Sequence, residues 1–312
     1  MLDPRGIYEI DEDAVARLWP NPPEPGAGPV LLHAVNGFVD AGSAGEVVVE
    51  HLLSGGEVTR VVTFDVDQLL DYRSKRATMT FATDRWADYD APSLVVDHVR
   101  DSEGTGFLLL HGAEPDLQWE RVVAALRQVV ERLGVSLTVG VHGIPMGIPH
   151  TRPLSVTAHA TRPELVGEHT SWFGTVKVPA SLAALLELRL GRAGHDAVGY
   201  TVHVPHYLAQ SSFPPAAVVA LEHVQRLTGL DLAPDGLAEA AQDATAEVER
   251  QVRESEEVAA VVHALEEQYD AFARAVGRTS LLAESAPIPT ADELGAEFER
   301  FLAQQGDEGP AI

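Results

Sequence analysis

The residues best suited to chemistry lie in two loops that pair proline with histidine. The segment GIPMGIPHTRP holds His150 and Arg152, and the segment HVPHY holds His206 and Tyr207. An arginine can hold a phosphate or carboxylate through parallel hydrogen bonds, and a histidine can move a proton near neutral pH. Because each loop follows a predicted strand, and because proline fixes the backbone, the four side chains would face one crevice if the strands are neighbours. His150 and His206 are then the candidate acid or base.

A third loop, NGFVDAGSAG, contains Asp40 and Ser43. Its glycines permit tight turns, and a helix that begins at Ser43 would expose N–H groups able to hold an anion. The loop lacks the lysine of a phosphate-binding loop and the glycine spacing of a dinucleotide site. A structural role, in which Asp40 or Ser43 caps the helix, is an equally good interpretation.

Other catalytic arrangements lack their signatures. The sequence has no Gly-x-Ser-x-Gly turn for a serine nucleophile, and its 13 histidines include no His-Glu-x-x-His pair. The absence of cysteine excludes disulfides, thiolate metal sites and cysteine nucleophiles. We therefore expect neither a metal site nor a cofactor.

Charge narrows the range of partners. The 312 residues include 47 Asp and Glu against 22 Lys and Arg, which gives a net charge of −25. Such a chain does not bind nucleic acid or an anionic membrane through its overall charge. It contains no apolar run of about 18 residues that could span a bilayer, and its first 17 residues are too acidic for a secretory signal. These features predict a cytoplasmic protein.

Strand-like and helix-like segments alternate over residues 30–230, which predicts an α/β domain with a mostly parallel sheet covered on both faces. The predicted strands are Val30–Val35, Arg60–Phe64, Thr78–Thr83, Ser93–Val99, Phe107–His111, Val135–His142 and Ala197–Val204. The predicted helices are Ser43–Leu53, a helix capped by Asp116 and closed by Gly134, Ala180–Leu190 and Pro215–Leu227.

Two further regions flank this domain. Residues 1–29 end in the segment NPPEPGAGP, which predicts an N-terminal arm hinged onto the body. Residues 231–312 form a predicted helical extension, with heptad-like apolar positions up to Val276 that Gln251 and Ser255 interrupt, and a capping box at residues 290–293. The heptad positions either pack on the same domain or contact a neighbouring subunit or partner, with Val262, Leu265 and Phe272 as the candidate contacts.

Four motifs together resemble the proteasome assembly chaperone 2 family, in its bacterial branch. They are GFVDAGS at residues 37–43, EPD at 114–116 with Trp119, PHTRP at 149–153 and PHY at 205–207. The resemblance covers about residues 31–227. It implies a three-layer αβα fold like that of purine nucleoside phosphorylases and related hydrolases, in homo-oligomers for which fold analogy favours a trimer. It also implies that relatives in eukaryotes act as non-enzymatic chaperones of proteasome assembly.

Two functions follow as hypotheses. The first is a non-catalytic, homo-oligomeric scaffold or assembly chaperone, with itself and proteasome subunits as the expected partners. The alternative is a nucleoside phosphorylase-like or hydrolase-like enzyme in which Arg152 holds a small anion and His150 or His206 moves a proton. Asp40, Ser43 and Tyr207 complete the candidate ligand-binding set. A third interpretation makes these motifs purely structural.

Overall fold

The protein is described by a computed structural model that covers residues 3–21, 23–24, 27–37, 39–167 and 175–281. Two compact units make up the chain, Met1–Glu266 and Glu267–Ile312. The first unit therefore extends past the predicted boundary at residue 230. The capping box predicted at residues 290–293 lies outside the described residues.

The larger sheet has eight strands and the smaller has two in the described part of the chain. The eight strands are β1 (Tyr8–Ile10), β2 (Val30–Asn36), β3 (Thr59–Phe64), β6 (Leu94–Arg100), β7 (Gly106–Ala113), β8 (Leu137–Met146), β9 (Val156–Ala160) and β10 (Ala197–Pro205). The other two, β4 (Met79–Ala82) and β5 (Arg85–Tyr89), form a hairpin of their own.

Seven α-helices accompany the strands in the described residues. They are α1 (Glu12–Leu18), α2 (Ala44–Ser54), α3 (Trp119–Leu133), α4 (Leu182–Arg192), α5 (Pro214–Thr228), α6 (Ala238–Glu254) and α7 (Glu256–Leu281). Short 3-10 helices precede α2, as η2 (Ala41–Ser43), and follow β10, as η5 (His206–Leu208). Ser255 has extended backbone angles, so the long helical stretch predicted after residue 235 is two helices that meet at this residue.

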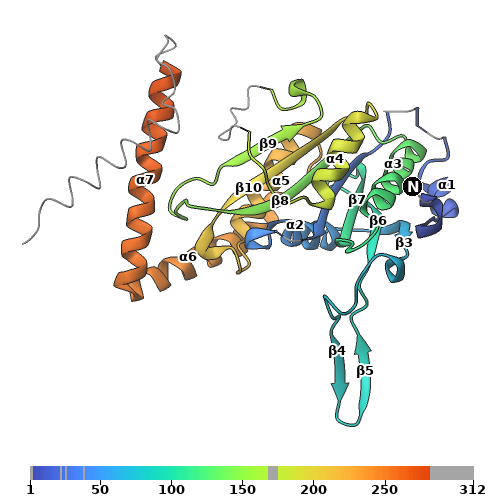
Figure 1. The fold of residues 1–312 in the computed structure, drawn as a ribbon, viewed down its shortest axis with the longest axis horizontal. Coiled ribbons are helices and arrows are strands. Elements are labelled where there is room, and N and C mark those ends of the chain that lie inside the picture. The colour runs from blue at the N-terminus through green and yellow to red at the C-terminus, as the bar shows by residue number, and fades with distance from the viewer. Residues whose placement is uncertain (1–2, 22, 25–26, 38, 168–174, 282–312) are drawn as a thin grey trace, which may run out of the picture. The chain divides into compact units, whose positions relative to one another are not determined.

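The sheet is mixed, with a parallel centre. Its strand order is β1-β3-β6-β7-β2-β8-β10-β9. The four central strands β7, β2, β8 and β10 pair in parallel, and the pairs on either side of them are antiparallel. This confirms the predicted α/β class, and the parallel centre brings the ends of β2, β8 and β10 to one edge of the sheet (Figure 1).

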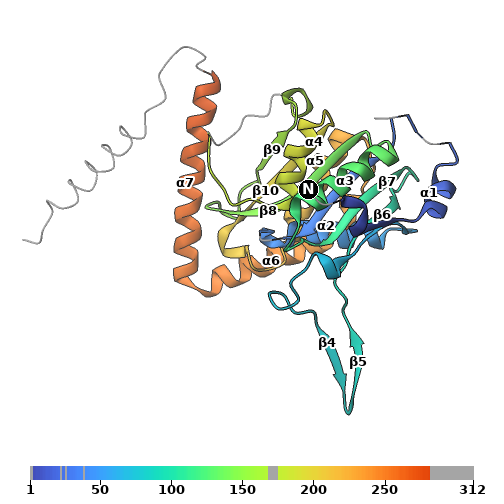
Figure 2. The ribbon, with the colours of Figure 1, turned by 45° about the vertical axis from the view of Figure 1, so that its right-hand side comes forward.

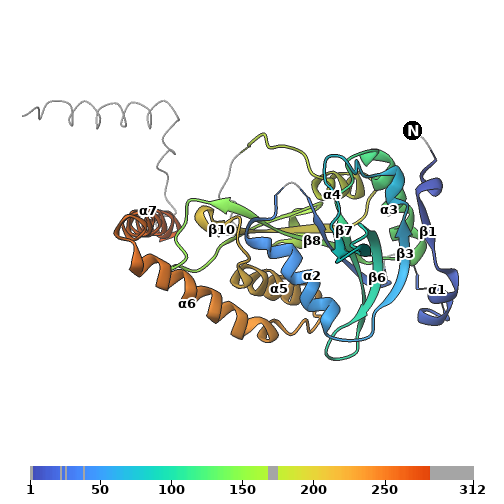
Figure 3. The same cartoon turned by 90° about the horizontal axis from the view of Figure 1, so that it is seen from below.

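Alternation of side chains along the strands builds a core on each face of the sheet. On one face, α2 and α5 pack against residues such as Leu32 and Val202, and α6 packs outside α5. On the other face, α3 and α4 pack against residues such as Leu31 and Leu108. Figure 3 shows α2 and α5 on one side of the strands and α3 and α4 on the other. The result is the predicted three layers.

The predicted N-terminal arm is instead part of this unit. Strand β1 pairs antiparallel with β3, so it forms the edge of the main sheet. Ile7 and Val15 are buried in the same core as β3 and α3. The N-terminal residues up to α1 are thus tied to the sheet through β1 rather than hinged onto it.

One local prediction is wrong. Asp116 does not cap α3: its carboxylate accepts a hydrogen bond from the N–H of Asp71 (2.7 Å), and Gln118 occupies the N-cap position. The strand predicted at Thr78–Thr83 is confirmed as β4, which pairs with β5 outside the main sheet.

Candidate functional site

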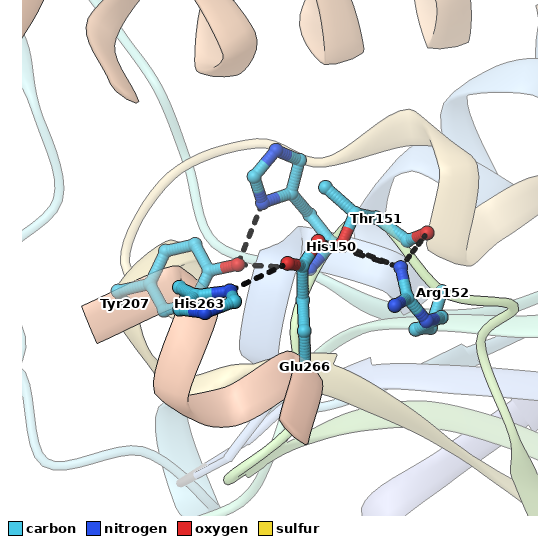
Figure 4. Close-up of polar contacts among 6 residues, drawn as sticks. All are labelled: His150, Thr151, Arg152, Tyr207, His263 and Glu266. Carbon is cyan, nitrogen blue, oxygen red and sulfur yellow. Dashed lines mark hydrogen bonds and ion pairs between the residues drawn. The ribbon is translucent and has the colours of Figure 1, made fainter. Parts of the chain in front are cut away.

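Strands β8 and β10 pair in parallel, in register from Thr138 with Ala197 to Met146 with Pro205. The proline-histidine loops that leave these two strands therefore start side by side. This places His150 beside Tyr207, as the sequence predicted if the strands were neighbours (Figure 4).

Tyr207 holds His150 through two hydrogen bonds. Its hydroxyl accepts from the backbone N–H of His150 (2.8 Å) and lies 2.7 Å from the Nδ1 atom of the same residue. Burial lowers the pKa of His150 and raises the pKa of Tyr207, so both groups are neutral near pH 7. The contact between the phenol and Nδ1 is a hydrogen bond in either neutral tautomer of the imidazole, with the proton on the phenol oxygen in one and on Nδ1 in the other. Tyr207 therefore engages Nδ1 and leaves Nε2 as the ring nitrogen open to another group.

Arg152 and Thr151 contact a carboxylate from the same chain. The Nη1 atom of Arg152 lies 3.4 Å from Oε1 of Glu266 in α7, and the Thr151 hydroxyl donates to the same oxygen. The hydrogen bond from Thr151, together with Arg152 and His263, lowers the pKa of Glu266. Glu266 therefore occupies the position that the sequence analysis assigned to an anionic ligand of Arg152 (Figure 4).

His206 lies apart from this network. Its side chain is exposed, and its ring stands edge-on to Tyr207 with 5.4 Å between ring centroids. His150 contacts Tyr207 from the other loop in a similar edge-on arrangement, at 5.9 Å. The crevice predicted for four side chains thus holds one histidine in a fixed hydrogen-bonded state and one on the surface.

Asp40 serves the structural role that the sequence analysis left open. Its carboxylate accepts hydrogen bonds from the N–H groups of Gly45 and Glu46 in the first turn of α2, and from Gly143 in β8 at 2.9 Å. These bonds cap the helix and tie it to the sheet. Ser43 makes no capping bond through its side chain and has a left-handed backbone (φ 50°). The anion predicted at this helix start is thus the carboxylate of Asp40 itself.

The contact between β8 and the turn before α2 is too close for any side chain at position 143. A Cβ atom added to Gly143 would lie 2.1 Å from the carbonyl oxygen of Ala41. This close approach lets the Gly143 N–H reach Asp40.

The sequence analysis missed a polar layer between the sheet and α4. His142 in β8 and His159 in β9 each place Nε2 3.4 Å from the hydroxyl of Thr201, and Nδ1 of His159 lies 2.8 Å from Glu187 in α4. His33 in β2 lies on the same face, and burial lowers its pKa to about 4. This row ends at a cleft of about 370 Å³ that is lined by His159, Glu187 and Arg192. The sequence did contain a signal for this layer. Residues two apart on a strand share a face, so Gly140 and His142 on the predicted strand Val135–His142 lie on one side of the sheet.

Metal chemistry has no obvious place in the described residues. No three His, Asp or Glu side chains among them gather in an arrangement that could hold a metal ion. Nor does any helix in the described ranges have the length and apolar character needed to cross a membrane.

Comparison with protein families identifies the architecture. The model of the PAC2 family matches residues 34–252, which include the loops of Asp40, His150, Arg152 and Tyr207. The chain belongs to the PAC2 family. The matched region ends before α7, so Glu266 and the candidate contacts Val262, Leu265 and Phe272 lie beyond it.

Solved structures extend this PAC2 relationship. A Mycobacterium tuberculosis protein of unknown function is 45% identical, with a TM-score of 0.82 and 97% of each chain covered. A Corynebacterium glutamicum protein of unknown function is 35% identical, with a TM-score of 0.77 over 85% of this chain and 97% of that one. A proteasome-assembly chaperone homologue from M. tuberculosis shares the fold, with 24% identity, a TM-score of 0.69, and 75% and 99% of the two chains covered. No curated protein matches the sequence.

The three candidate contact residues of α7 differ in exposure. Val262 is buried, Leu265 is partly buried and Phe272 is exposed. A substitution at Val262 would therefore disturb the fold as well as any interface, whereas Phe272 is 43% exposed.

Proposed function

We propose that this PAC2 protein is a non-catalytic assembly chaperone that works in the cytoplasm as a homo-oligomer and binds proteasome subunits. The observation that carries the proposal is membership of the PAC2 family, whose model spans the α/β body. The fold shared with a proteasome-assembly chaperone homologue supports the kind of partner.

The state of the strand-end groups also favours binding over catalysis. The one arginine predicted to hold a substrate anion contacts Glu266, and Nδ1 of His150 is hydrogen-bonded to Tyr207. Asp40 is engaged by three backbone N–H groups. An anion site needs its cation to be accessible, and here a carboxylate of the same chain already contacts that cation.

The experiment that tests the proposal is reconstitution of proteasome assembly. Core-particle α and β subunits from the source organism would be mixed with and without the purified chain, and assembly intermediates followed on native gels and by native mass spectrometry. We expect a complex between the chain and the core-particle subunits and faster formation of complete particles. No complex and no change in the assembly rate at micromolar concentrations would refute the chaperone role.

The enzyme hypothesis has its own test on the same preparation. Inorganic phosphate and nucleosides would be added separately in a thermal-unfolding series, because any ligand that binds the native state raises the melting temperature. The variant Glu266→Gln is included, since it weakens the contact that covers Arg152. A rise in melting temperature with phosphate that is larger in this variant would favour an anion site and count against a purely non-catalytic role.

A further inference from the structure

The β4–β5 hairpin projects from the α/β body without joining the main sheet. The chain leaves β3, forms two strands joined at Thr83 and Asp84, and returns to β6 (Figures 1 and 2). In the described part of the chain, β4 and β5 pair only with each other. A two-stranded hairpin alone is marginally stable in water, so contact with another surface would stabilise it.

The hairpin carries the large side chains that protein interfaces favour. Phe81 and Trp86 oppose each other across the strands, with ring centroids 5.1 Å apart, and are 56% and 65% exposed. Met79 and Tyr89 form the next exposed pair. Aromatic residues and methionine are enriched at protein interfaces, and a few of them carry most of the binding energy. Four together on one protrusion form a contact surface rather than scattered exposure.

Charge indicates what this surface binds. Residues 71–90 hold four basic and four acidic residues, so this segment is neutral in a chain of net charge −25, and three of its basic residues, Arg73, Lys75 and Arg76, cluster just before β4. The remainder of the chain is strongly acidic. A second copy of the chain therefore offers the opposite charge, and opposite charges steer association and favour one register over others.

The first helix provides a matching pocket on that second copy. A cavity of about 200 Å³ has apolar lining residues that include Val15, Trp19 and Leu133. Glu12 and Arg132 also line it and form an ion pair with each other (2.8 Å). Asp11 and Asp13, on either side of Glu12 at the start of α1, are exposed and outside that ion pair. The pocket thus combines an apolar floor with two exposed carboxylates beside it, which complement an aromatic tip with basic residues at its base.

We propose that the hairpin of one copy inserts Trp86 into the α1 pocket of a second copy. The contact joins two different surfaces, so each copy gives one hairpin and receives another. Repetition closes a ring if the rotation between successive copies closes, and builds an open filament otherwise. The inference deepens the self-association part of the proposed function and says nothing of how proteasome subunits are bound.

The test uses two variants of the full chain that damage opposite halves of the contact. Trp86→Ser removes the inserted side chain, and Ala16→Arg adds bulk and positive charge to the pocket lining. Val178→Ser removes another exposed apolar side chain, 74% exposed, and is the matched control. Native mass would be measured by sedimentation velocity and native mass spectrometry over a concentration series.

We expect the wild type and Val178→Ser to form oligomers, and each hairpin or pocket variant to associate about thirtyfold more weakly. An equimolar mixture of Trp86→Ser with Ala16→Arg retains one intact hairpin and one intact pocket, so it should give a heterodimer and nothing larger. A monomeric wild type, an oligomer unaffected by either substitution, or a mixture that stays monomeric would overturn the proposal.

The chaperone assay separates this inference from the proposed function. If Trp86→Ser becomes monomeric yet still binds proteasome subunits, both statements stand. If Trp86→Ser keeps its oligomeric state but no longer binds proteasome subunits, the hairpin binds a different protein and the self-association proposal fails. If neither wild type nor variants affect assembly while the mixture gives the heterodimer, the proposed function alone is refuted.

Discussion

Two regions of the molecule differ in how their side chains are engaged. They are the loops at the ends of β2, β8 and β10, and the β4–β5 hairpin. At the strand ends, Asp40 bonds backbone groups of α2 and β8, and Arg152 contacts Glu266. On the hairpin, Phe81 and Trp86 contact each other but stay more than half exposed. In the first region Asp40 and Arg152 have partners in the same chain, whereas in the second the two aromatic rings leave exposed apolar surface that another molecule could contact.

This difference bears on how a PAC2 chain should be searched for function. Proline-histidine loops at the ends of parallel strands look like a site for a small ligand, because such edges are where α/β folds bind ligands. Here Asp40 bonds backbone groups of α2 and β8, and Arg152 contacts Glu266 in α7. The large exposed aromatic side chains lie elsewhere, on the β4–β5 hairpin.

The largest effect is expected from Asp40→Ala. The substitution leaves the N–H groups of Gly45, Glu46 and Gly143 without their acceptor, so we expect a loss of about 3 kcal/mol in the free energy of unfolding. Asp40→Asn keeps an oxygen acceptor and should lose about 1 kcal/mol. Urea unfolding followed by circular dichroism gives both values. Equal, small losses in the two variants would show that the carboxylate is free to serve a ligand.

The pH dependence of stability provides the next test, through His33. Burial lowers the pKa of this histidine to about 4, below the ordinary value of 6.5 that it regains on unfolding. Between these values the unfolded chain binds the proton and the folded chain does not, so stability falls as the pH drops from about 6.5 to 4. The loss attributable to His33 is up to about 3 kcal/mol.

The variant His33→Gln isolates this contribution. We expect its free energy of unfolding to depend less on pH over the same interval, as measured by urea unfolding at several pH values. His206→Gln, at an exposed histidine, is the control for loss of an imidazole. If the slope in His33→Gln equals that of the wild type, the acid sensitivity comes from other groups.

Much of the fold could be predicted from the sequence because its signals are local. Hydrophobic runs such as Val30–Val35 and helical spacing such as that before Gly134 identify the elements within a few residues. The meeting of His150 with Tyr207 was also predictable, since it required only that two parallel strands be neighbours. The role of the polar loops could not be predicted in the same way, because their residues fitted both a capping and a ligand-binding interpretation.

The rest depended on contacts between residues far apart in the chain. Glu266 meets Arg152 across 114 positions, and nothing in the spacing of either residue indicates the pair. Asp116 has the sequence context of a helix cap, yet its carboxylate bonds Asp71 in another loop. Apolar and polar residues alternate in the hairpin as they do in a strand of the main sheet, but this alternation does not show whether the apolar face is buried. Burial is decided by the three-dimensional arrangement, which no local pattern contains.

A smaller effect is expected from Tyr207→Phe. Loss of the hydroxyl removes the hydrogen-bond partner of Nδ1 and the acceptor for the backbone N–H of His150, at a cost of about 1 kcal/mol in the free energy of unfolding. Burial lowers the pKa of His150, so the pKa should stay below its ordinary value in this variant. Urea unfolding measures the loss of stability, and NMR titration of the histidine ring protons measures the pKa. A pKa that rises to the ordinary value would mean that the phenol, rather than burial, keeps the imidazole neutral.

The smallest effect on stability is expected where the side chains are exposed. The double variant Phe81→Ser, Trp86→Ser should unfold within about 0.5 kcal/mol of the wild type, because neither ring is covered by the rest of the chain. The measurement must be made in dilute solution, where the chain is monomeric, since association itself adds apparent stability. A loss of more than about 2 kcal/mol under those conditions is typical of buried residues and would mean that the hairpin packs on its own chain. The side chains of the hairpin would then be engaged by their own chain, like those of the loops at the strand ends. The surface that binds a second copy would have to lie elsewhere on the molecule.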